Sequence, residues 1–319
     1  MKKKDGIFYG KILLFGEYSV MCDSMALTVP YTHFQGELSF FNEDKYTNQA
    51  FATESNKVLK EFYQHLQSLN SKAELLASLD LNRLNNDLNH GMYFESSIPQ
   101  GFGVGSSGAL VAAIYEKYAS PVSENPENLT VENLQRLKKI FSQMESWFHG
   151  VSSGLDPLNC FLRQPLLIKP NAHIQPVGIP REFAKDGGIF LINTGKPGKT
   201  GPLVSLFFEK CKEDGFRNLV KSEMILYNNN SINAIIQAEF GRFFQNLKLL
   251  SGFLFTHFRP MIPESYVSLW QQGLDTGDFY LKLCGSGGGG FLLGFTENLE
   301  NTRQILQSKN VEIIPVSRF

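Results

Sequence analysis

Short apolar runs in the first half of the chain alternate with segments in which apolar residues recur every three or four positions. The short runs predict strands, and the longer repeats predict amphipathic helices. Strands are expected at Ile7–Phe15, Ala26–Pro30, Gln35–Phe41, Gly91–Ser97, Leu166–Lys169 and Gly188–Asn193. Helices are expected at Ser55–Asn70, at Ala109–Tyr118, and from a cap at Thr130 through Phe148.

The second half of the chain has mainly helical patterns and ends in two strand-like segments around a run of glycines. Helices are expected at Leu203–Cys211 and Ser231–Leu254, and strands at Tyr280–Cys284 and Phe291–Phe295. This order is typical of an α+β domain. A stretch containing three prolines separates the two halves and is the best candidate for a domain boundary: Pro170, Pro176 and Pro180.

Composition indicates a chain that can bury a large core. Hydrophobic residues make up 42% of the 319 positions, and most of the 27 Phe are expected inside. The 30 basic and 31 acidic residues nearly cancel, which argues against a nucleic-acid partner but is compatible with a local basic pocket for phosphates. The cysteines form no CxxC pair, so reduced thiols are expected rather than disulfides or a zinc site: Cys22, Cys160, Cys211 and Cys284.

The N-terminal lysines resemble the start of a signal peptide, but the segment after them does not continue the pattern. Lys11, Gly16 and Glu17 interrupt its apolar stretch, and no cleavage site of small residues follows. No window offers about 18 uninterrupted apolar residues, as a membrane-spanning helix requires. A cytoplasmic protein without a membrane partner is therefore expected.

The glycine-rich segment Pro99–Ala109 is the strongest candidate for an anion-binding loop. Glycines at alternate positions let backbone N–H groups approach an anion. The predicted helix that follows directs its positive N-terminus to the same place, and two serines add hydroxyls for a phosphate or Mg²⁺. The alternative is a plain glycine loop. The residues predicted to bind the nucleotide are Pro99, Gly101, Gly103, Gly105, Ser106, Ser107, Gly108 and Ala109.

Three glycine segments do not fit the common nucleotide-binding motifs. Pro99–Ala109 has Ser at the third glycine position of a Rossmann fingerprint and no Walker A lysine. Gly285–Gly290 formally matches G-x-G-x-x-G, but a predicted strand follows it instead of a helix, so its four consecutive glycines suggest close packing. Gly195–Thr200 lacks the first Walker A glycine, since position 193 is Asn.

Three charged residues could serve phosphoryl transfer, which needs a carboxylate and a hydroxyl for Mg²⁺, a cation, and a carboxylate for the acceptor. Lys11 begins an apolar strand, Glu145 lies in the last turn of a predicted helix, and Asp156 follows a stretch rich in Gly and Ser. Each also has an ordinary interpretation as a surface, helix-face or turn residue.

Five segments, in order along the chain, resemble the GHMP kinase superfamily, and the mevalonate kinases most closely. Gly10–Val20 resembles G-K-x-x-L-F-G-E-H-A-V, and Pro99–Ala109 is similar to P-x-G-x-G-L-G-S-S-A. Glu145–Asp156 matches E-x-x-x-H-G-x-x-S-G-x-D in spacing. Leu191–Val204 resembles T-N-T-K-x-P-x-x-T-x-x-L-V, and Lys282–Gly290 resembles K-L-T-G-A-G-G-G-G.

The resemblance implies an α+β fold of two domains, with ATP and an alcohol acceptor bound between them. An N-terminal α/β domain of the ribosomal S5-like type would cover residues 1–184, and a C-terminal ferredoxin-like domain residues 185–319. The implied cofactors are ATP and Mg²⁺, and the implied partner is a small-molecule alcohol substrate. Mevalonate kinases are often dimers, so a homodimer is also expected, although no segment identifies an interface.

The resemblance also implies roles for single residues. Asp156 would be the general base or orient the acceptor hydroxyl, and Lys11 would keep its carboxylate ionised. Ser107 and Glu145 would bind Mg²⁺. The residues expected near the acceptor are Glu17, Tyr18, Ser153, Gly287 and Gly288.

Four departures from the mevalonate kinase pattern leave the acceptor open. Tyr18 replaces His and Gly108 replaces Ala, and both resemble bacterial phosphomevalonate kinases. Ser152 and Tyr9 each replace Pro. A phosphorylated acceptor would need further cations, for which the candidates are Arg181, Lys196 and Lys199.

The leading hypothesis is ATP- and Mg²⁺-dependent phosphorylation of mevalonate to 5-phosphomevalonate, a step in isoprenoid precursor synthesis. The alternatives are a phosphomevalonate kinase, a GHMP sugar kinase, and a catalytically silent GHMP fold that serves as a sensor or scaffold.

Overall fold

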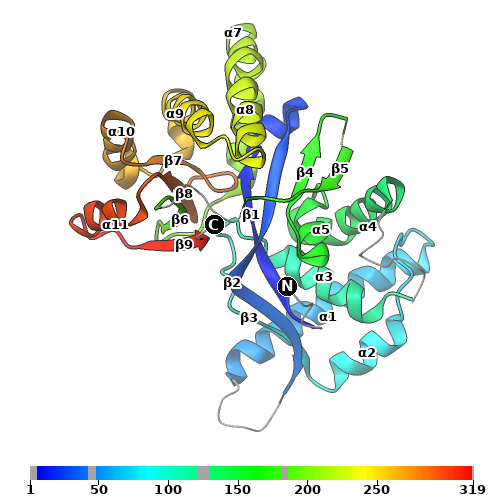
Figure 1. Cartoon of the computed structure of the whole chain (residues 1–319). Coiled ribbons are helices and arrows are strands. Elements are labelled where there is room, and N and C mark those ends of the chain that lie inside the picture. Colours follow the sequence, from blue (N-terminus) through cyan, green and yellow to red (C-terminus); the bar gives the residue numbers. More distant parts are fainter. Residues whose placement is uncertain (1–5, 42–47, 121–129, 172, 181–185, 318–319) are drawn as a thin grey trace. The chain divides into compact units, whose positions relative to one another are not determined.

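The strands and helices form largely where the apolar pattern places them (Figure 1). The computed structural model describes residues 6–41, 48–120, 130–171, 173–180 and 186–317. The chain forms two compact units from alternating segments. The first unit consists of Met1–Lys11, Pro30–Pro99 and Gly105–Gln164, and the second of Ile12–Val29, Gln100–Val104 and Pro165–Phe319. The expected boundary between residues 184 and 185 lies outside the described residues and stays a prediction.

In its described residues, the first unit combines a strand pair with five helices. Part of β2 (Ala26–Phe40) pairs antiparallel with β3 (Met92–Ser96), with Gly36 opposite Ser96 and Phe40 opposite Met92. β1 (Phe8–Phe15), which pairs with β2, contributes its first residues. The helices are α1 (Gln49–Ser71), α2 (Leu81–Asn89), α3 (Ser106–Tyr118), α4 (Val131–His149) and α5 (Leu155–Leu162).

Three of these helices, α1, α2 and α4, begin at side-chain caps, and the caps of α1 and α4 bear on the predicted bounds. The Thr130 hydroxyl accepts a hydrogen bond from the Asn133 amide (3.3 Å), which confirms the predicted cap of α4. The Asn48 side chain accepts one from the amide of Phe51 (3.1 Å), and α1 therefore starts earlier than the apolar pattern indicated. A capping oxygen satisfies an amide that has no partner within its helix.

The second unit contains a four-stranded antiparallel sheet. Its strands are β6 (Gly188–Asn193), β7 (Tyr280–Leu283), β8 (Phe291–Thr296) and β9 (Ile313–Ser317), in the order β7-β8-β6-β9. Helices separate β6 from β7 and β8 from β9, which gives the expected ferredoxin-like arrangement. The mixture of helices and antiparallel sheets confirms the α+β class.

The remaining elements of the second unit complete its core. The start of β2 pairs with β4 (Leu166–Lys169), which pairs with β5 (His173–Pro176). The helices are α6 (Thr200–Lys210), α7 (Asp214–Leu219), the π-helical η2 (Val220–Met224), α8 (Ile225–Ile236), α9 (Phe240–His257), α10 (Val267–Thr276) and α11 (Leu299–Gln307). Short 3-10 turns lie at η1 (Ser19–Cys22), η3 (Arg259–Met261) and η4 (Glu264–Tyr266).

Two predictions are wrong about how many elements a segment forms. The two strands expected at Ala26–Pro30 and Gln35–Phe41 are the single strand β2, whose exposed middle broke the apolar pattern. The helix expected over Ser231–Leu254 is two helices, α8 and α9, because Ala238 has a left-handed backbone with φ of 57°. Alanine is uncommon in that conformation, so the sequence carries no local signal for the break.

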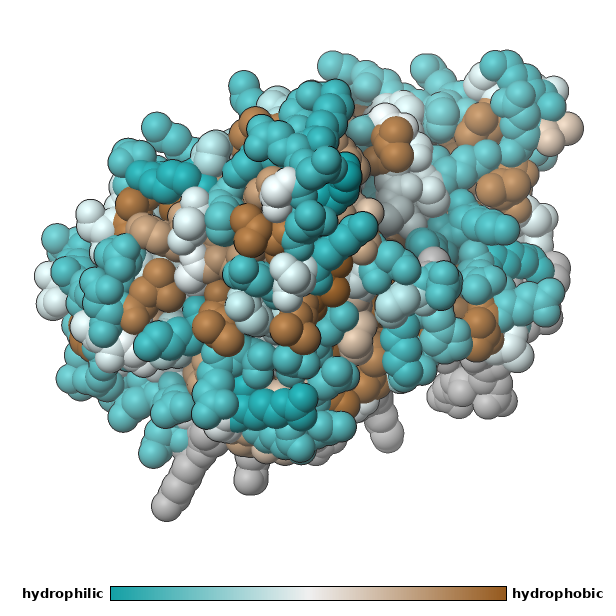
Figure 2. Space-filling model, turned by 90° about the horizontal axis from the view of Figure 1, so that it is seen from above, coloured by the Kyte–Doolittle hydropathy of each residue, from teal (hydrophilic) through white to brown (hydrophobic). Residues whose placement is uncertain are grey.

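Figure 2 shows a face on which hydrophilic residues predominate and hydrophobic ones form small, separate groups. None of the helices in the described part of the chain is long and apolar enough to cross a membrane.

Candidate active site

The glycine-rich loop leads directly into α3. Gly101, Gly103 and Gly105 have φ of 76°, 78° and 80°, the left-handed region that glycine adopts without steric cost. Gly105 is the N-cap of α3, which begins at Ser106, three residues before the predicted start. The first turn of α3 therefore carries Ser106, Ser107, Gly108 and Ala109. The Ala109 amide donates to the carbonyl of Gly105 (3.0 Å), and the amides before it are those that a helix leaves without a partner of its own, where an anion can bind.

Other positions of this loop are shaped by close packing. Pro99 lies between β3 and the loop. The Gly198 amide donates to the carbonyl of Gly101 (3.0 Å), and a Cβ on Gly103 would lie 3.0 Å from the carbonyl oxygen of Cys284. Glycine is therefore required at Gly101 and Gly103 by the protein's own packing and backbone conformation, whether or not a ligand is bound.

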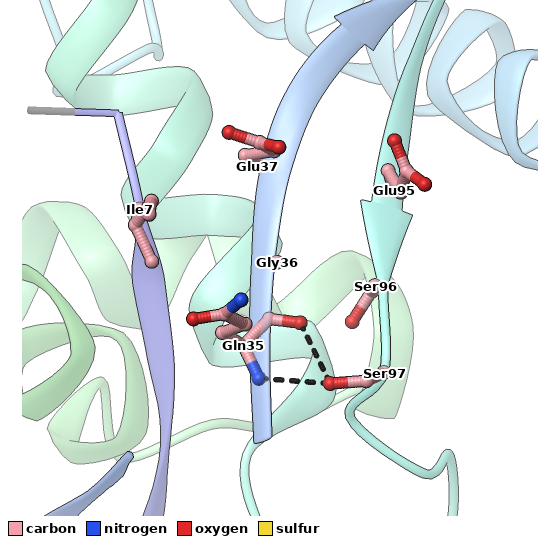
Figure 3. A pocket seen from close by; sticks show the side chains of 7 residues that line it. All are labelled: Ile7, Gln35, Gly36, Glu37, Glu95, Ser96 and Ser97. Carbon is pink, nitrogen blue, oxygen red and sulfur yellow. Dashed lines mark hydrogen bonds between the residues drawn. The ribbon is translucent and has the colours of Figure 1, made fainter. Parts of the chain in front are cut away.

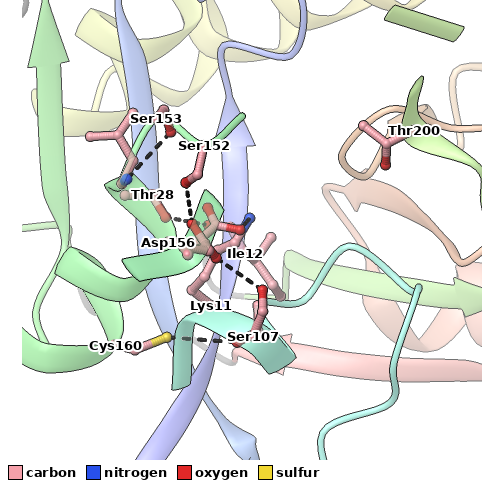
Figure 4. Close-up of polar contacts among 12 residues, drawn as sticks. Lys11, Ile12, Thr28, Ser107, Ser152, Ser153, Asp156, Cys160 and Thr200 are labelled. Atoms are coloured by element: carbon pink, nitrogen blue, oxygen red, sulfur yellow. Dashed lines mark hydrogen bonds and ion pairs between the residues drawn. The ribbon is translucent and has the colours of Figure 1, made fainter. Parts of the chain in front are cut away.

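Lys11 and Asp156 form an ion pair in the first unit. The Lys11 Nζ lies 2.9 Å from Asp156 Oδ2. The Lys11 side chain is 6% exposed, whereas that of Asp156, in the first turn of α5, is 38% exposed. The structure thus brings together two residues that the sequence predicted as partners, and it leaves the carboxylate accessible (Figure 4).

Ser107 and Glu145 are also in contact. The Ser107 hydroxyl donates to Glu145 Oε1 (2.9 Å), and His149 Nε2 lies 2.9 Å from the same hydroxyl oxygen. The Ser152 hydroxyl donates to the other oxygen of this carboxylate, Oε2. His149 and Ser152 belong to the Glu145–Asp156 motif, but the motif predicts neither contact, since both depend on the structure around the end of α4.

Glu145 is a carboxyl group in an unfavourable environment for its charge. It is 4% exposed, and burial raises its pKa from 4.5 to about 7, with a further upward contribution from the negative charge of Asp156. The hydrogen bonds from Ser152 and Ser107 and the charge of Lys11 act in the opposite direction. A cation bound here would lower the pKa of Glu145, because its positive charge favours the ionised form.

The chemistry of these oxygens fits Mg²⁺. The ion prefers hard oxygen ligands and is commonly held by one or two carboxylates together with substrate phosphates. Ser107 and Glu145 present a hydroxyl and a carboxylate oxygen side by side at the N-terminus of α3. Within the described residues, no group of three His, Cys, Asp or Glu side chains forms a metal cluster.

Two glycines at the start of α3 leave room for Lys11 and Asp156 to pack against it. A Cβ on Gly105 would lie 2.8 Å from Lys11 Cγ. A Cβ on Gly108 would lie 2.8 Å from the backbone carbon of Asp156 and 3.0 Å from its Cβ. Gly108 is thus required by the close packing of α3 against the start of α5, which is a local reason for its departure from the mevalonate kinase pattern.

Glu17, expected near the acceptor, lies in a buried ion pair in the second unit. The Lys282 Nζ donates to Glu17 Oε1 (2.5 Å) and to the carbonyl of Leu283 (3.1 Å). The side chains of Glu17 and Lys282 are 4% and 1% exposed. Sequence reasoning did not predict this pair, whose members are 265 residues apart.

Tyr18 is also enclosed by the second unit. Its hydroxyl donates to the carbonyl of Ser286 (2.6 Å), and its ring centroid lies 5.0 Å from that of Phe207 and 5.2 Å from that of Phe258. Its φ of 61° is unusual for a bulky residue. Burial, followed by the charge of Glu17, raises its pKa, so the hydroxyl stays a hydrogen-bond donor at neutral pH.

The closing glycine run packs against its own unit. The Gly288 amide donates to the carbonyl of Met261 (2.6 Å), and a Cβ on Gly287 would lie 2.5 Å from the same oxygen. A Cβ on Gly288 would lie 2.7 Å from Leu203 Cδ1. The close packing suggested by the glycines is confirmed, and its partners are protein atoms.

Of the other predicted residues, Ser153 is exposed, and its hydroxyl accepts from the Leu155 amide (3.3 Å). Lys196 and Lys199 lie in the loop between β6 and α6. Arg181 lies outside the described residues.

A hollow of about 300 Å³ elsewhere in the first unit contains none of the predicted site residues. Gln35 and Ser97 bond to each other at its edge, and Glu37 and Glu95 face each other across β2 and β3 (Figure 3). Its lining residues are Ile7, Gln35, Gly36, Glu37, Glu95, Ser96 and Ser97.

Comparison with known proteins gives one family match and several similar folds. Residues 60–163 match the family model of the GHMP kinases N terminal domain. No curated protein matches the sequence.

Three solved structures illustrate the similarity. L. major mevalonate kinase in complex with R-mevalonate has 18% identity and a TM-score of 0.63, over 97% of this chain and 92% of that one. Streptococcus pneumoniae phosphomevalonate kinase in complex with phosphomevalonate and AMPPNP has 14% identity and a TM-score of 0.61, over 97% of both chains. Lactococcus lactis galactokinase complexed with galactose has 13% identity and a TM-score of 0.59, over 98% of this chain and 93% of that one. At these identities the similarity concerns the fold.

The resemblance expected from five sequence segments is confirmed. Residues 60–163 thus match the N-terminal domain of the GHMP kinases, and the chain as a whole has the fold of the small-molecule kinases compared above.

Proposed function

We propose that the chain is an ATP- and Mg²⁺-dependent kinase that phosphorylates an alcohol group, with mevalonate as its acceptor. The observation that carries this proposal is the pairing of Lys11 with Asp156 beside the pairing of Ser107 with Glu145, all within the first unit. These two pairs supply the cation, the protein carboxylate that contacts the acceptor hydroxyl, and the Mg²⁺ ligands that phosphoryl transfer needs.

In this mechanism the amides at the start of α3, before Ala109, would bind the phosphates of ATP, and Ser107 and Glu145 would hold Mg²⁺. Mg²⁺ would neutralise charge on the phosphates. Asp156 accepts a hydrogen bond from the acceptor hydroxyl and takes its proton as the oxygen bonds to the γ-phosphorus and ADP leaves. Lys11, held 2.9 Å from Asp156, offsets negative charge around the acceptor oxygen.

Mevalonate is preferred because two departures towards phosphomevalonate kinases have local structural explanations. Gly108 avoids a clash with Asp156, and Tyr18 bonds to the carbonyl of Ser286. Neither contact requires a phosphorylated acceptor. Phosphomevalonate or a sugar is the second candidate, since phosphomevalonate kinase and galactokinase share the fold. The cytoplasmic location and the homodimer remain predictions.

The test is ATP consumption with mevalonate, phosphomevalonate and a panel of sugars, for the wild type and Asp156→Asn. The wild type should turn over mevalonate fastest. The variant should lose about 10²–10⁴-fold in kcat, because its amide cannot accept the proton. Asp214→Asn, in the exposed first turn of α7, is the matched control and should retain wild-type turnover.

Wild-type turnover by Asp156→Asn would contradict the assigned role. Faster turnover of phosphomevalonate or a sugar than of mevalonate would contradict mevalonate as the acceptor, but it would still support the proposed kinase chemistry. No turnover of any acceptor by the wild type would favour the sensor or scaffold alternative.

A further inference from the structure

We propose that Ser152 is a positioning residue, which holds Glu145 in the orientation that binds Mg²⁺. This inference rests on the proposed function, because it assigns a supporting contact to the same metal site. Ser152 occupies a position where the mevalonate kinase pattern has proline, which has no hydroxyl.

The two oxygens of Glu145 have different partners. Oε1 accepts from the Ser107 hydroxyl (2.9 Å). Glu145 Oε1 and the Ser107 hydroxyl oxygen are the two proposed Mg²⁺ ligands. Oε2 accepts from the Ser152 hydroxyl. Binding of a cation by Ser107 and Oε1 would replace their mutual hydrogen bond, but it would leave the bond between Ser152 and Oε2 in place. One oxygen is thus anchored while the other is available to the metal.

Ser152 is itself held on two sides. Its hydroxyl oxygen accepts from the Gly154 amide (2.9 Å), which leaves its proton directed to Glu145. Its carbonyl accepts from the Ser142 hydroxyl (2.6 Å), which lies on α4. Ser142 is less than one turn before Glu145 on that helix, so Ser152 is fixed relative to the carboxylate it contacts.

A glycine brings this turn close enough to α4. Gly154 has φ of 73°, and a Cβ on it would lie 2.7 Å from the amide nitrogen of Ser142. The segment carrying Ser152 therefore rests directly on the helix backbone. Because Glu145 is 4% exposed, solvent offers its carboxylate little alternative hydrogen bonding if the Ser152 hydroxyl is removed.

The experiment measures the affinity for ADP by calorimetry, with Mg²⁺ and with EDTA, for the wild type, Ser152→Ala, Ser152→Thr and Ser146→Ala. The Ser146 hydroxyl bonds to the helix carbonyl of Ser142 (2.6 Å), so Ser146→Ala removes a hydroxyl next to Glu145 without touching its carboxylate. Supporting contacts of metal ligands typically contribute about 10–100-fold to metal affinity. Ser152→Ala should therefore lose about tenfold or more of the Mg²⁺-dependent gain in ADP affinity.

Three further results are expected. Affinity in EDTA should be unchanged in every variant, Ser152→Thr should restore the Mg²⁺-dependent gain, and Ser146→Ala should behave as the wild type. In the kinase assay, Ser152→Ala should need more Mg²⁺ for half-maximal rate and should approach the wild-type kcat when Mg²⁺ is saturating. A merely structural role would lower affinity equally with Mg²⁺ and with EDTA.

If a folded Ser152→Ala variant shows the Mg²⁺ dependence of the wild type, the role of Ser152 is wrong, but the proposed function is unaffected. Equal losses with Mg²⁺ and EDTA, or failure of a folded Ser152→Thr to restore the gain, would also overturn the role of Ser152. Absence of any Mg²⁺-dependent ADP binding by the wild type would instead overturn the proposed function, so the two failures are distinguishable.

Discussion

At the scale of single residues, the burial of charge decides several assignments. Lys282 and Glu17 are both almost fully enclosed, and in such surroundings each charge depends on its partner. The sequence placed Glu17 near the acceptor and Lys282 in a glycine motif, but patterns within one segment cannot reveal a pair formed between distant segments. The contact of His149 with Ser107 escaped prediction for the same reason, whereas the contact of Ser152 with Glu145 depends on the conformation of the turn after α4.

Glu17→Gln should destabilise the protein by about 3 kcal/mol, because it leaves the Lys282 ammonium buried without its carboxylate partner. Combining it with Lys282→Met should recover part of the loss, which urea unfolding of both variants would measure. If Glu17→Gln changes only the KM for the acceptor and leaves unfolding unaffected, Glu17 is an acceptor ligand, as the sequence predicted.

Glu145 should make the metal-free protein less stable as the pH rises. Its folded pKa, about 7, lies above the ordinary value of 4.5, so the folded state binds the proton more tightly than the unfolded state. Stability should therefore fall between about pH 4.5 and 7 by up to about 3 kcal/mol and then level off. Urea unfolding in EDTA at several pH values tests this.

Glu145→Gln is the control for this pH dependence, since it cannot ionise and should show a smaller decline over the same interval. A decline as large as that of the wild type would assign the effect to another group.

At the scale of elements, the sequence predicted those bounds of strands and helices that are set by neighbouring residues in the chain. The bounds of β4 and β6 and the cap of α4 follow from apolar runs and from one threonine. The early start of α3 and the break between α8 and α9 depend on backbone conformation at Gly105 and Ala238, which periodicity does not report. The close approach of α3 and α5 is a further tertiary feature, visible in the sequence only as one glycine.

Gly108→Ala should test this approach. The added methyl group would push against the backbone of Asp156, so we expect a loss of about 1–3 kcal/mol in stability from overpacking. A displaced Asp156 should also lower kcat by about tenfold or more, since small misplacements of reacting groups are costly. Urea unfolding and the kinase assay measure the two effects.

Gly252→Ala is the matched control. Gly252 lies in α9, and a Cβ added there would meet no atom within 4 Å beyond the backbone of its own helix. Alanine should therefore stabilise that helix by about 0.5–1 kcal/mol. Equal effects of the two substitutions on stability would rule out the steric explanation at Gly108.

At the scale of the whole molecule, the family resemblance predicted which site residues lie together, and the apolar periodicity did not. Lys11, Ser107, Glu145 and Asp156 come from four elements, and no apolar pattern predicts that they meet in one unit. The family resemblance predicted their pairing because the order of motifs is tied to the fold. It did not predict the contacts of Tyr18 and Ser152, where this chain departs from the family pattern.

A nucleotide that binds the folded protein and not the unfolded chain should raise the free energy of unfolding of the chain. ADP with Mg²⁺ at about 100 times its Kd should add about 2.7 kcal/mol to the free energy of unfolding. Thermal unfolding should show a higher Tm with Mg²⁺ than with EDTA at the same ADP concentration. Glu145→Gln should lose most of the difference between the two, whereas a Tm that is independent of Mg²⁺ in the wild type would contradict the metal site.

The contacts of Tyr18 and Gly108 also bear on how this chain can diverge. In the genetic code, every tyrosine codon is one base from a histidine codon, and every glycine codon is one base from an alanine codon. Mutation therefore supplies the residues of the mevalonate kinase pattern at both positions repeatedly. The bond from Tyr18 to the Ser286 carbonyl and the lack of space between Gly108 and Asp156 mean that selection, and not the rarity of the mutations, would keep both departures in this lineage.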